Sequence, residues 1–305
     1  MADTSSSCGN LPLDRALLEN LLHSLRDDSC SSLSSSEERE EEQRKASKEL
    51  RNLTKQSSIN RVCIAEAGAI PILIKKLRSN DFHTQANAIA ALLNLTLKNE
   101  ENKKAIIYAL GVDPIVEALQ KGLLLETREN AAALLFNLSY CNSVRVMVSS
   151  SKGVFTGLVC LLDRGSSRGK KDAAAALYNL LQIRGNRALA VRAGAVPPLV
   201  GLAQDPSSCL VDESLTVLLS LASHQEGRFA IRKARGSQAL LGLLERGSDS
   251  NKEYACAVLL VLCHEDYGCV EEVCNLNGLE LLAELCASGT ERAQRKAAKL
   301  IKLLK

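Results

Sequence analysis

The sequence is poor in aromatic residues and in proline. Of its 305 residues only 3% are aromatic, none is Trp and 6 are Pro, whereas 46% are hydrophobic. The apolar residues are mostly Leu, Ala, Val and Ile, which recur at helical spacing with few breaks. Length alone would allow about two domains. The composition therefore indicates a chain built from aliphatic helices.

Long apolar runs and a strong charge of one sign are also missing. No run approaches the roughly 18 apolar residues of a spanning helix, so we expect no membrane insertion. The formal net charge of +3 is too small to predict a nucleic acid as partner. Residues 1–10 lack the features of a signal peptide, and 11 cysteines are an odd number for a disulfide framework. We therefore expect a reducing compartment, the cytoplasm or the nucleus.

Motifs for catalysis, metals and cofactors are absent as well. Several potential metal ligands lie in one stretch, but no CxxC pair occurs among them and their spacing fits no tetrahedral zinc pattern: Cys256, Cys263, His264, Cys269 and Cys274. In the repeat register described below, Cys274 takes the place of Ile64, which predicts a small core residue. No nucleophile motif or phosphate-binding loop is present. We predict a protein that is not an enzyme and holds no metal and no cofactor.

What the sequence does contain is a repeat of about 42 residues, of the length found in armadillo and HEAT solenoids. Its first marker is a glycine in apolar surroundings, at Gly68, Gly111, Gly153, Gly194, Gly236 and Gly278. Its second marker ends the long helix of each unit, at Asn52-Leu53, Asn94-Leu95, Asn137-Leu138, Asn179-Leu180, Ser220-Leu221, Val261-Leu262 and Lys302-Leu303. Because repeats of this kind bury their cores only by stacking, the unbroken period favours one continuous array over two domains.

One unit shows three predicted helices. A short first helix contains residues 62–65, and Gly68 permits the chain reversal after it. Pro71 falls at the start of a second helix, and Thr84 is a plausible N-cap of the third. Three helices per unit favour armadillo over HEAT, so we predict an all-α, right-handed superhelical armadillo solenoid of six full repeats after a partial one. Its predicted boundaries within 37–305 are about 37–57 (partial), 58–98, 99–141, 142–183, 184–224, 225–266 and 267–305.

The residues before the repeats, 1–36, form a separate predicted segment. Leucines at helical spacing predict an amphipathic helix over 13–26, and a Ser-rich linker follows at 29–36. The leucine face can cover the exposed apolar end of the first repeat, which a solenoid needs. Alternatively, it can bind in a groove of another protein.

The repeats have the strings of a particular group. These are NRVCIAEAGAIPILIKKL and TQANAIAALLNLTL, followed by RENAAALLFNLS, RGKKDAAAALYNL and VDESLTVLLSLASHQEGRFAI. In this order they resemble the armadillo region of the plant U-box ubiquitin ligases, from about Glu37 to the C-terminus. In those ligases a U-box before the repeats recruits the ubiquitin-conjugating enzyme. We expect none here, because the 36 preceding residues are too few and lack its CPI-like opening.

The asparagines of the second marker are the strongest candidates for a binding site: Asn52, Asn94, Asn137 and Asn179. Third helices line the concave groove of an armadillo stack, where a carboxamide can pair with the N–H and C=O of an extended peptide. The alternative is that each asparagine bonds the neighbouring repeat and is architectural.

Two groups of basic residues offer side-chain selectivity to such a groove. The first opens one third helix and the second shares a face of the last: Arg168, Lys170 and Lys171, and Arg292, Arg295, Lys299 and Lys302. Lys and Arg in these places favour an acidic or phosphorylated ligand. The alternative is that both groups are solvated surface.

Two functional hypotheses follow. The first is a non-catalytic adaptor that binds a protein partner, an extended peptide or kinase-type client, in its groove; the resemblance implies receptor-like kinases and other ubiquitin-ligase clients. The second is a ubiquitin-ligase component that acts with a U-box or other ligase partner. The sequence does not predict the oligomeric state.

Overall fold

The computed structural model describes residues 13–26, 35–140, 142–205 and 208–305, in which every regular element is an α-helix. Within these ranges there is no β-strand, in agreement with the helical periodicity. The helices pack into two compact units, Met1–Leu138 and Ser139–Lys305. The boundary lies inside the predicted repeat domain, and the sequence period is the same on both sides of it.

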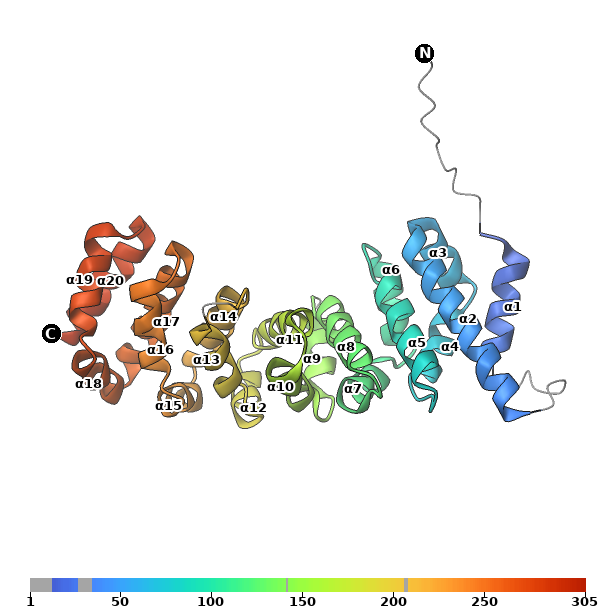
Figure 1. The fold of residues 1–305 in the computed structure, drawn as a ribbon, viewed down its shortest axis with the longest axis horizontal. Coiled ribbons are helices and arrows are strands. Elements are labelled where there is room, and N and C mark those ends of the chain that lie inside the picture. Colours follow the sequence, from blue (N-terminus) through green and yellow to red (C-terminus); the bar gives the residue numbers. More distant parts are fainter. Residues whose placement is uncertain (1–12, 27–34, 141, 206–207) are drawn as a thin grey trace, which may run out of the picture. The chain divides into compact units, whose positions relative to one another are not determined.

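Each repeat has one long helix, here called its third helix, that carries the second sequence marker. In the first unit α5 contacts both α2 and α8, and in the second unit contacts run from α11 through α14 and α17 to α20 (Figure 1). Their central leucines, such as Leu92 and Leu177, are fully buried. The third helices are α2 (Ser36–Gln56), α5 (Phe82–Leu95), α8 (Leu125–Leu138), α11 (Ser167–Leu180), α14 (Val211–Ala222), α17 (Asp249–Glu265) and α20 (Glu291–Leu304).

Two shorter helices precede the third helix in each full repeat. The first helices are α3 (Ser58–Glu66), α6 (Glu100–Tyr108), α9 (Asn142–Ser150), α12 (Asn186–Arg192), α15 (Gln225–Lys233) and α18 (Tyr267–Asn275). The second helices are α4 (Ala69–Lys76), α7 (Val112–Lys121), α10 (Val154–Arg164), α13 (Val196–Gln204), α16 (Gly236–Arg246) and α19 (Gly278–Ser288). This three-helix pattern is that of an armadillo repeat. No single helix in the described ranges is long and apolar enough to cross a membrane; α9 and α10 meet that criterion only together, bent by 86°.

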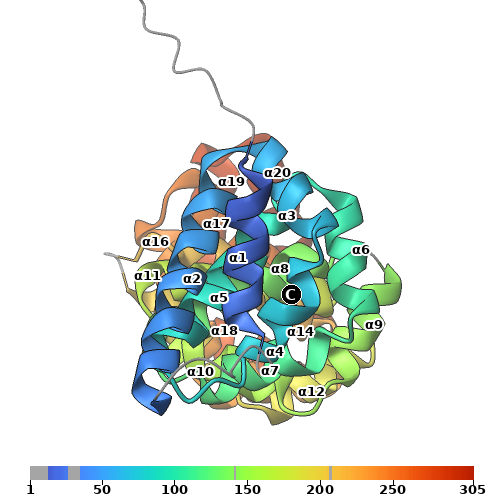
Figure 2. The ribbon, with the colours of Figure 1, turned by 90° about the vertical axis from the view of Figure 1, so that its right-hand side faces the viewer.

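The predicted N-terminal amphipathic helix is α1 (Arg15–Leu25), which begins at the side-chain cap of Asp14. Its leucines Leu18, Leu22 and Leu25 are buried, and the helix contacts α2 and α4 (Figure 2). A hydrogen bond of 2.7 Å from Ser24 Oγ to Glu42 Oε1 joins α1 to α2. The leucine face therefore covers the end of the first unit. Most of the predicted linker, 29–36, lies outside the described residues.

The recurring glycines turn out to serve two purposes. Gly68 is left-handed, with φ of 81°, as the predicted chain reversal requires. At Gly236 the left-handed residue is instead the preceding Arg235, with φ of 58°. A Cβ on Gly236 would collide with the Cγ2 of Ile231 and lie 2.8 Å from its carbonyl oxygen. The same repeat marker thus reflects backbone conformation in one repeat and close packing in another.

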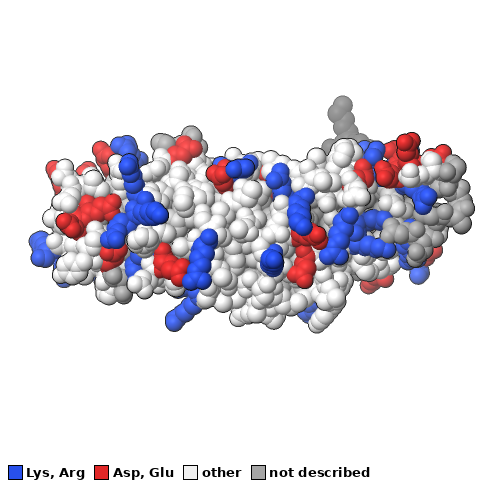
Figure 3. All heavy atoms as spheres, turned by 90° about the horizontal axis from the view of Figure 1, so that it is seen from below, with Lys and Arg blue, Asp and Glu red and all other residues white. Residues whose placement is uncertain are grey.

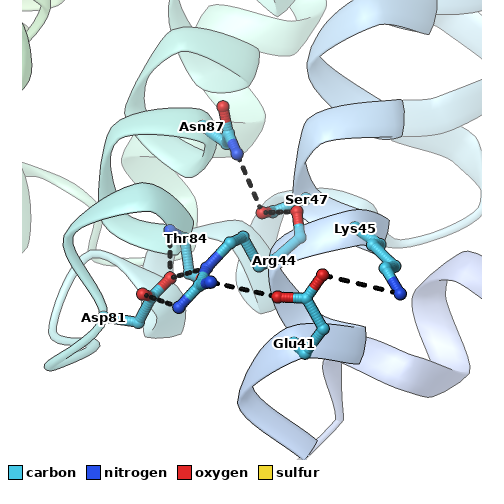
Figure 4. Close-up of polar contacts among 7 residues, drawn as sticks. All are labelled: Glu41, Arg44, Lys45, Ser47, Asp81, Thr84 and Asn87. Carbon is cyan, nitrogen blue, oxygen red and sulfur yellow. Dashed lines mark hydrogen bonds and ion pairs between the residues drawn. The ribbon is translucent and has the colours of Figure 1, made fainter. Parts of the chain in front are cut away.

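The predicted cap of the third helix α5 is corrected by the structure. Asp81, and not Thr84, is the N-cap: its Oδ2 accepts a hydrogen bond of 2.7 Å from the Thr84 backbone N–H. Arg44 of α2 donates to the other carboxylate oxygen at 2.8 Å (Figure 4). Burial opposes ionisation of Asp81, but these hydrogen bonds outweigh it and hold its pKa below the usual range. The cap therefore also ties α5 to α2.

Candidate functional site

Three of the four ladder asparagines, Asn94, Asn137 and Asn179, each donate a hydrogen bond to a Thr or Ser side chain 40 or 41 residues earlier in the chain. Asn94 Nδ2 on α5 donates to Thr54 Oγ1 on α2 at 3.1 Å, and Thr54 in turn donates to the carbonyl of Arg51 at 2.8 Å. The Thr54 side chain is fully buried, so its hydroxyl needs both partners. The carboxamide is thereby fixed in one orientation.

The same arrangement recurs once more in each unit. In the first unit Asn137 Nδ2 donates to Thr96 Oγ1 at 3.0 Å. In the second unit Asn179 Nδ2 donates to Ser139 Oγ at 3.0 Å. The hydroxyl belongs in each case to the residue two positions after the preceding Asn, so the sequence pattern Asn-Leu-Thr/Ser encodes both halves of the pair.

The other side of each amide is available for a ligand. Asn94, Asn137 and Asn179 are half-buried, and within the described residues their Oδ1 atoms accept no hydrogen bond. Asn52 is exposed, and its side chain makes no hydrogen bond to any described residue. An amide whose nitrogen is held by the protein and whose oxygen is open can accept a peptide N–H. The structure therefore contains the contact of the architectural hypothesis and leaves the acceptor that the binding hypothesis needs.

The ladder changes after Asn179. Leu181 occupies the position of the hydroxyl residue, and the next third helix carries Ser220 in place of asparagine. Ser220 Oγ donates to the carbonyl of Thr216 in its own helix at 3.3 Å. Both halves of the pair are thus lost at the same step along the chain.

Polar contacts continue along the third helices of the first unit. Asn87 of α5 donates to Ser47 of α2 at 3.2 Å (Figure 4). Arg51 Nη1 donates a hydrogen bond of 3.4 Å to Asn87 Oδ1. The same guanidinium forms an ion pair of 2.6 Å with Glu126 of α8. Arg51 precedes Asn52 and so lies beside the ladder. A ligand on this surface meets a guanidinium already paired with a carboxylate.

The two predicted basic groups are not brought together. Arg168, Lys170 and Lys171 lie at the start of α11, at the opposite end of that helix from Asn179. Arg168 pairs with Asp172 at 3.6 Å, and Lys171 pairs with Glu213 at 3.3 Å. On the face shown in Figure 3, basic and acidic side chains lie next to one another. The first group therefore meets neighbouring carboxylates rather than forming an open anion site.

In the second group, on α20, the four side chains differ. Arg295 donates from Nε to the carbonyl of Glu291 at 3.1 Å. Arg292, Lys299 and Lys302 are exposed and have no side-chain partner among the described residues. Lys299 and Lys302 line an open pocket, which Arg292 and Arg295 do not.

A second series of asparagines was not predicted from the sequence. Asn60, Asn102 and Asn186 begin or lie in first helices, are buried, and donate to the C-terminal carbonyls of the preceding third helices. A neighbouring basic residue makes a similar contact at other positions, as when Arg228 donates to the carbonyl of Ala222 at 3.3 Å. The sequence contains a pattern that could have predicted this series. Each asparagine lies four positions before the buried aliphatic residue of its first helix, and Arg228 lies three positions before Ile231. They fix the first helix onto the end of the third.

The predicted alignment of Cys274 with Ile64 in the repeat is wrong. The residue that takes the place of Ile64 is Val273, which is fully buried, and Cys274 is only half-buried. The fixed spacing failed because the left-handed Asn277 adds a residue before Gly278. Cys256 is fully buried, and burial raises the pKa of its thiol to about 12. In the described part of the chain no three metal-binding side chains form a cluster.

Fold and site together define an armadillo-repeat protein. The family model described as the plant U-box protein ARM repeat region matches residues 27–305, and the chain belongs to this family. It is 34% identical to U-box domain-containing protein 16 of Arabidopsis thaliana, over 84% of this chain and 38% of that protein. It is 40% identical to U-box domain-containing protein 1 of Medicago truncatula, over 86% of this chain and 38% of that protein.

A solved structure shows the same fold. It is a computationally designed armadillo repeat protein for modular peptide recognition, with a TM-score of 0.67 and 24% identity. The likeness covers 80% of this chain and 99% of the designed one. The present chain spans little more than a third of the length of the two plant relatives.

Proposed function

We propose that this chain is a protein-interaction scaffold that binds an extended peptide segment of a client along its third helices. The observation that carries the proposal is the tethered amide: Asn94, Asn137 and Asn179 each have a fixed nitrogen and an open Oδ1. Such an acceptor recognises backbone N–H groups whatever the side chains are. The family's name supports clients in ubiquitin-dependent signalling. We propose kinases as the client class and the cytoplasm or nucleus as the location.

The test starts from peptides selected on the intact chain from a random display library. Their dissociation constants are then measured by fluorescence anisotropy for the wild type and for the Asn94→Ala, Asn137→Ala and Asn179→Ala variants. Each lost hydrogen bond is worth about 0.5–1.5 kcal/mol, so we expect a loss of about 2- to 12-fold per substitution. Asn52→Ala is the matched control: its amide is not tethered, so we expect a smaller loss.

Peptides with N-methylated backbone positions separate recognition from architecture. If Oδ1 accepts peptide N–H groups, methylation at the paired positions weakens wild-type binding but adds nothing in the matching Asn→Ala variant. Unchanged affinity together with a lower unfolding midpoint would show that the asparagines only hold the repeats together. Circular dichroism supplies the unfolding midpoint.

The relatives' names favour a second candidate, a component of a ubiquitin ligase. The family model that matches is that of the repeat region. We expect the purified chain to form no polyubiquitin with activating and conjugating enzymes. Adding a U-box ligase partner tests the component role: clients bound by this chain would then be ubiquitinated faster. Polyubiquitin made by the chain alone would overturn the adaptor proposal.

A further inference from the structure

The second unit presents different chemistry where the asparagine ladder has ended. At the ladder position α17 carries Val261 and α20 carries Lys302. Both side chains line one open pocket of about 570 Å³, whose walls also include Leu260, Leu303, Lys299 and Arg228. Within the second unit, the repeat position that carries the amide of Asn179 on α11 is therefore part of an apolar pocket on α17 and α20.

The floor of this pocket is aliphatic. Leu260 and Val261 are half-buried, and Leu303 is 38% exposed. Covering these partly exposed side chains with apolar surface removes them from water, which is favourable. A branched aliphatic side chain of a ligand fits this chemistry, and the volume is sufficient for it and its neighbours.

The rim of the pocket is cationic. Lys299 and Lys302 are exposed and have no partner in the described part of the chain. Arg228 and His264 also line the pocket, with Arg228 donating to the carbonyl of Ala222. The described lining contains no Asp or Glu. Lys299 and Lys302 differ in this respect from Arg168 and Lys171 at the start of α11, which are paired with carboxylates.

We propose that this pocket binds an acidic segment of the client in which one aliphatic side chain is flanked by aspartates or glutamates. The aliphatic side chain packs on Leu260, Val261 and Leu303, and the flanking carboxylates pair with Lys299 and Lys302. Charge-assisted hydrogen bonds of this kind give orientation as well as affinity. The inference rests on the proposed function for the client as a whole, but the pocket can be tested without the ladder.

The probe is a fluorescein-labelled pentapeptide with a central leucine and glutamates on both sides, titrated with the intact chain at low salt. Matched probes replace the leucine by alanine, the glutamates by glutamines, or the glutamates by phosphoserines. We expect the leucine–glutamate probe to bind, and both the alanine and the glutamine probes to bind about tenfold more weakly or worse. Equal binding of the alanine probe would overturn the role of the apolar floor. Binding of the phosphoserine probe alone would overturn the assignment to carboxylates.

The protein variants have a control on the same helix. Lys299→Glu with Lys302→Glu should lower affinity for the probe at least tenfold. Arg292→Glu with Arg295→Glu changes the net charge equally but lies outside the pocket, and should change affinity less than twofold. If both double variants lost equal affinity for the probe, the effect would come from the net charge of the protein rather than from the pocket, and the proposal would be overturned. Lys299→Gln with Lys302→Gln repeats the test should the reversed charges lower the unfolding midpoint.

The outcome is separable from that of the ladder. The variant with Asn94→Ala, Asn137→Ala and Asn179→Ala should bind the short probe as the wild type does, because none of these residues lines the pocket. If the asparagine substitutions do not weaken binding of the selected peptides but the short probe binds as expected, the proposed function fails and this inference holds. Loss of probe binding in the asparagine variant, with the fold retained, would contradict it.

Discussion

The carboxamide of Asn94 has a partner within the protein and, in the proposed function, a second partner in the ligand. Its nitrogen is bonded to Thr54 of the preceding third helix, which selects one rotamer before any ligand arrives. Ordering a free side chain on binding costs about 0.5–1.5 kcal/mol. The tether removes most of that cost for Asn94, whereas Asn52, which has no tether to a described residue, retains it. The hydroxyl residue is therefore as much a part of the site as the asparagine.

The repeat glycines give a prediction at this scale. Gly68→Ala places a methyl group in open space but at φ of 81°, which costs roughly 1–2 kcal/mol. Gly236→Ala drives a methyl group against the fully buried Ile231, and overpacking of this kind costs about 1–3 kcal/mol. Urea unfolding followed by circular dichroism measures both losses.

Asparagine substitutions distinguish the two causes. Asn tolerates the left-handed conformation, so we expect Gly68→Asn to be less destabilising than Gly68→Ala. Gly236→Asn adds further atoms to a crowded place and should be at least as destabilising as Gly236→Ala. The same rank order at both positions would contradict the assignment of different roles.

At the scale of the element, the N-cap of α5 makes stability depend on pH. Hydrogen bonds from Arg44 and the Thr84 N–H, opposed by burial, lower the pKa of Asp81 in the folded state. A depressed carboxyl pKa contributes stability that is present above the unfolded value of about 3.9 and is lost as the pH falls through the folded value. We therefore expect Asp81→Asn to flatten the decline in the free energy of unfolding below about pH 4.

The measurement is urea unfolding of the wild type and Asp81→Asn from pH 7 down to the lowest pH at which both remain folded. Asn still caps a helix, so the two proteins should differ most at neutral pH and converge in acid. Parallel curves would show that Asp81 is not responsible. Thr84→Ala should keep part of the pH dependence, because Arg44 and the backbone N–H of residue 84 still lower the pKa of Asp81 when the side-chain contribution of Thr84 is lost.

The helices themselves were largely predictable. The leucine spacing predicted a helix over 13–26, where α1 (Arg15–Leu25) is found. The Asn52-Leu53 marker predicted a partial repeat over about 37–57, where α2 (Ser36–Gln56) is found. The predicted N-cap of α5 was wrong because Asp and Thr are both good capping residues. Only the extended backbone conformation of Asp81 decides between Asp81 and Thr84.

The positions of the candidate site residues could be predicted from the sequence, but their interaction partners could not. The phase of the asparagines follows from the repeat, and the Asn-Leu-Thr/Ser pattern was present in the sequence. Which basic residues are paired could not be predicted, because Lys171 and Glu213 are brought together only when α11 packs on α14. The pocket beside Lys299 likewise depends on how α17, α20 and the start of α15 surround it.

At the scale of the whole molecule, stability in a repeat array is approximately a sum over repeats and their nearest-neighbour interfaces. The contacts agree, since each third helix packs on the third helices next to it within its unit. A local loss of packing should therefore open the repeats around it before the rest of the chain. A client segment bound in the second unit would in that case stay bound while the first unit opens.

Leu92→Ala tests this directly. Leu92 is fully buried in α5, and truncating such a leucine costs about 2–5 kcal/mol. We expect amide hydrogen exchange, followed by mass spectrometry, to accelerate in α2, α4, α5 and α8, and to stay unchanged in α17 to α20. Leu177→Ala is the matched control in the second unit and should accelerate exchange around α11 and leave α2 to α5 protected. If either substitution accelerated exchange equally along the whole chain, the 305 residues would unfold as one cooperative body, and the nearest-neighbour account would be wrong.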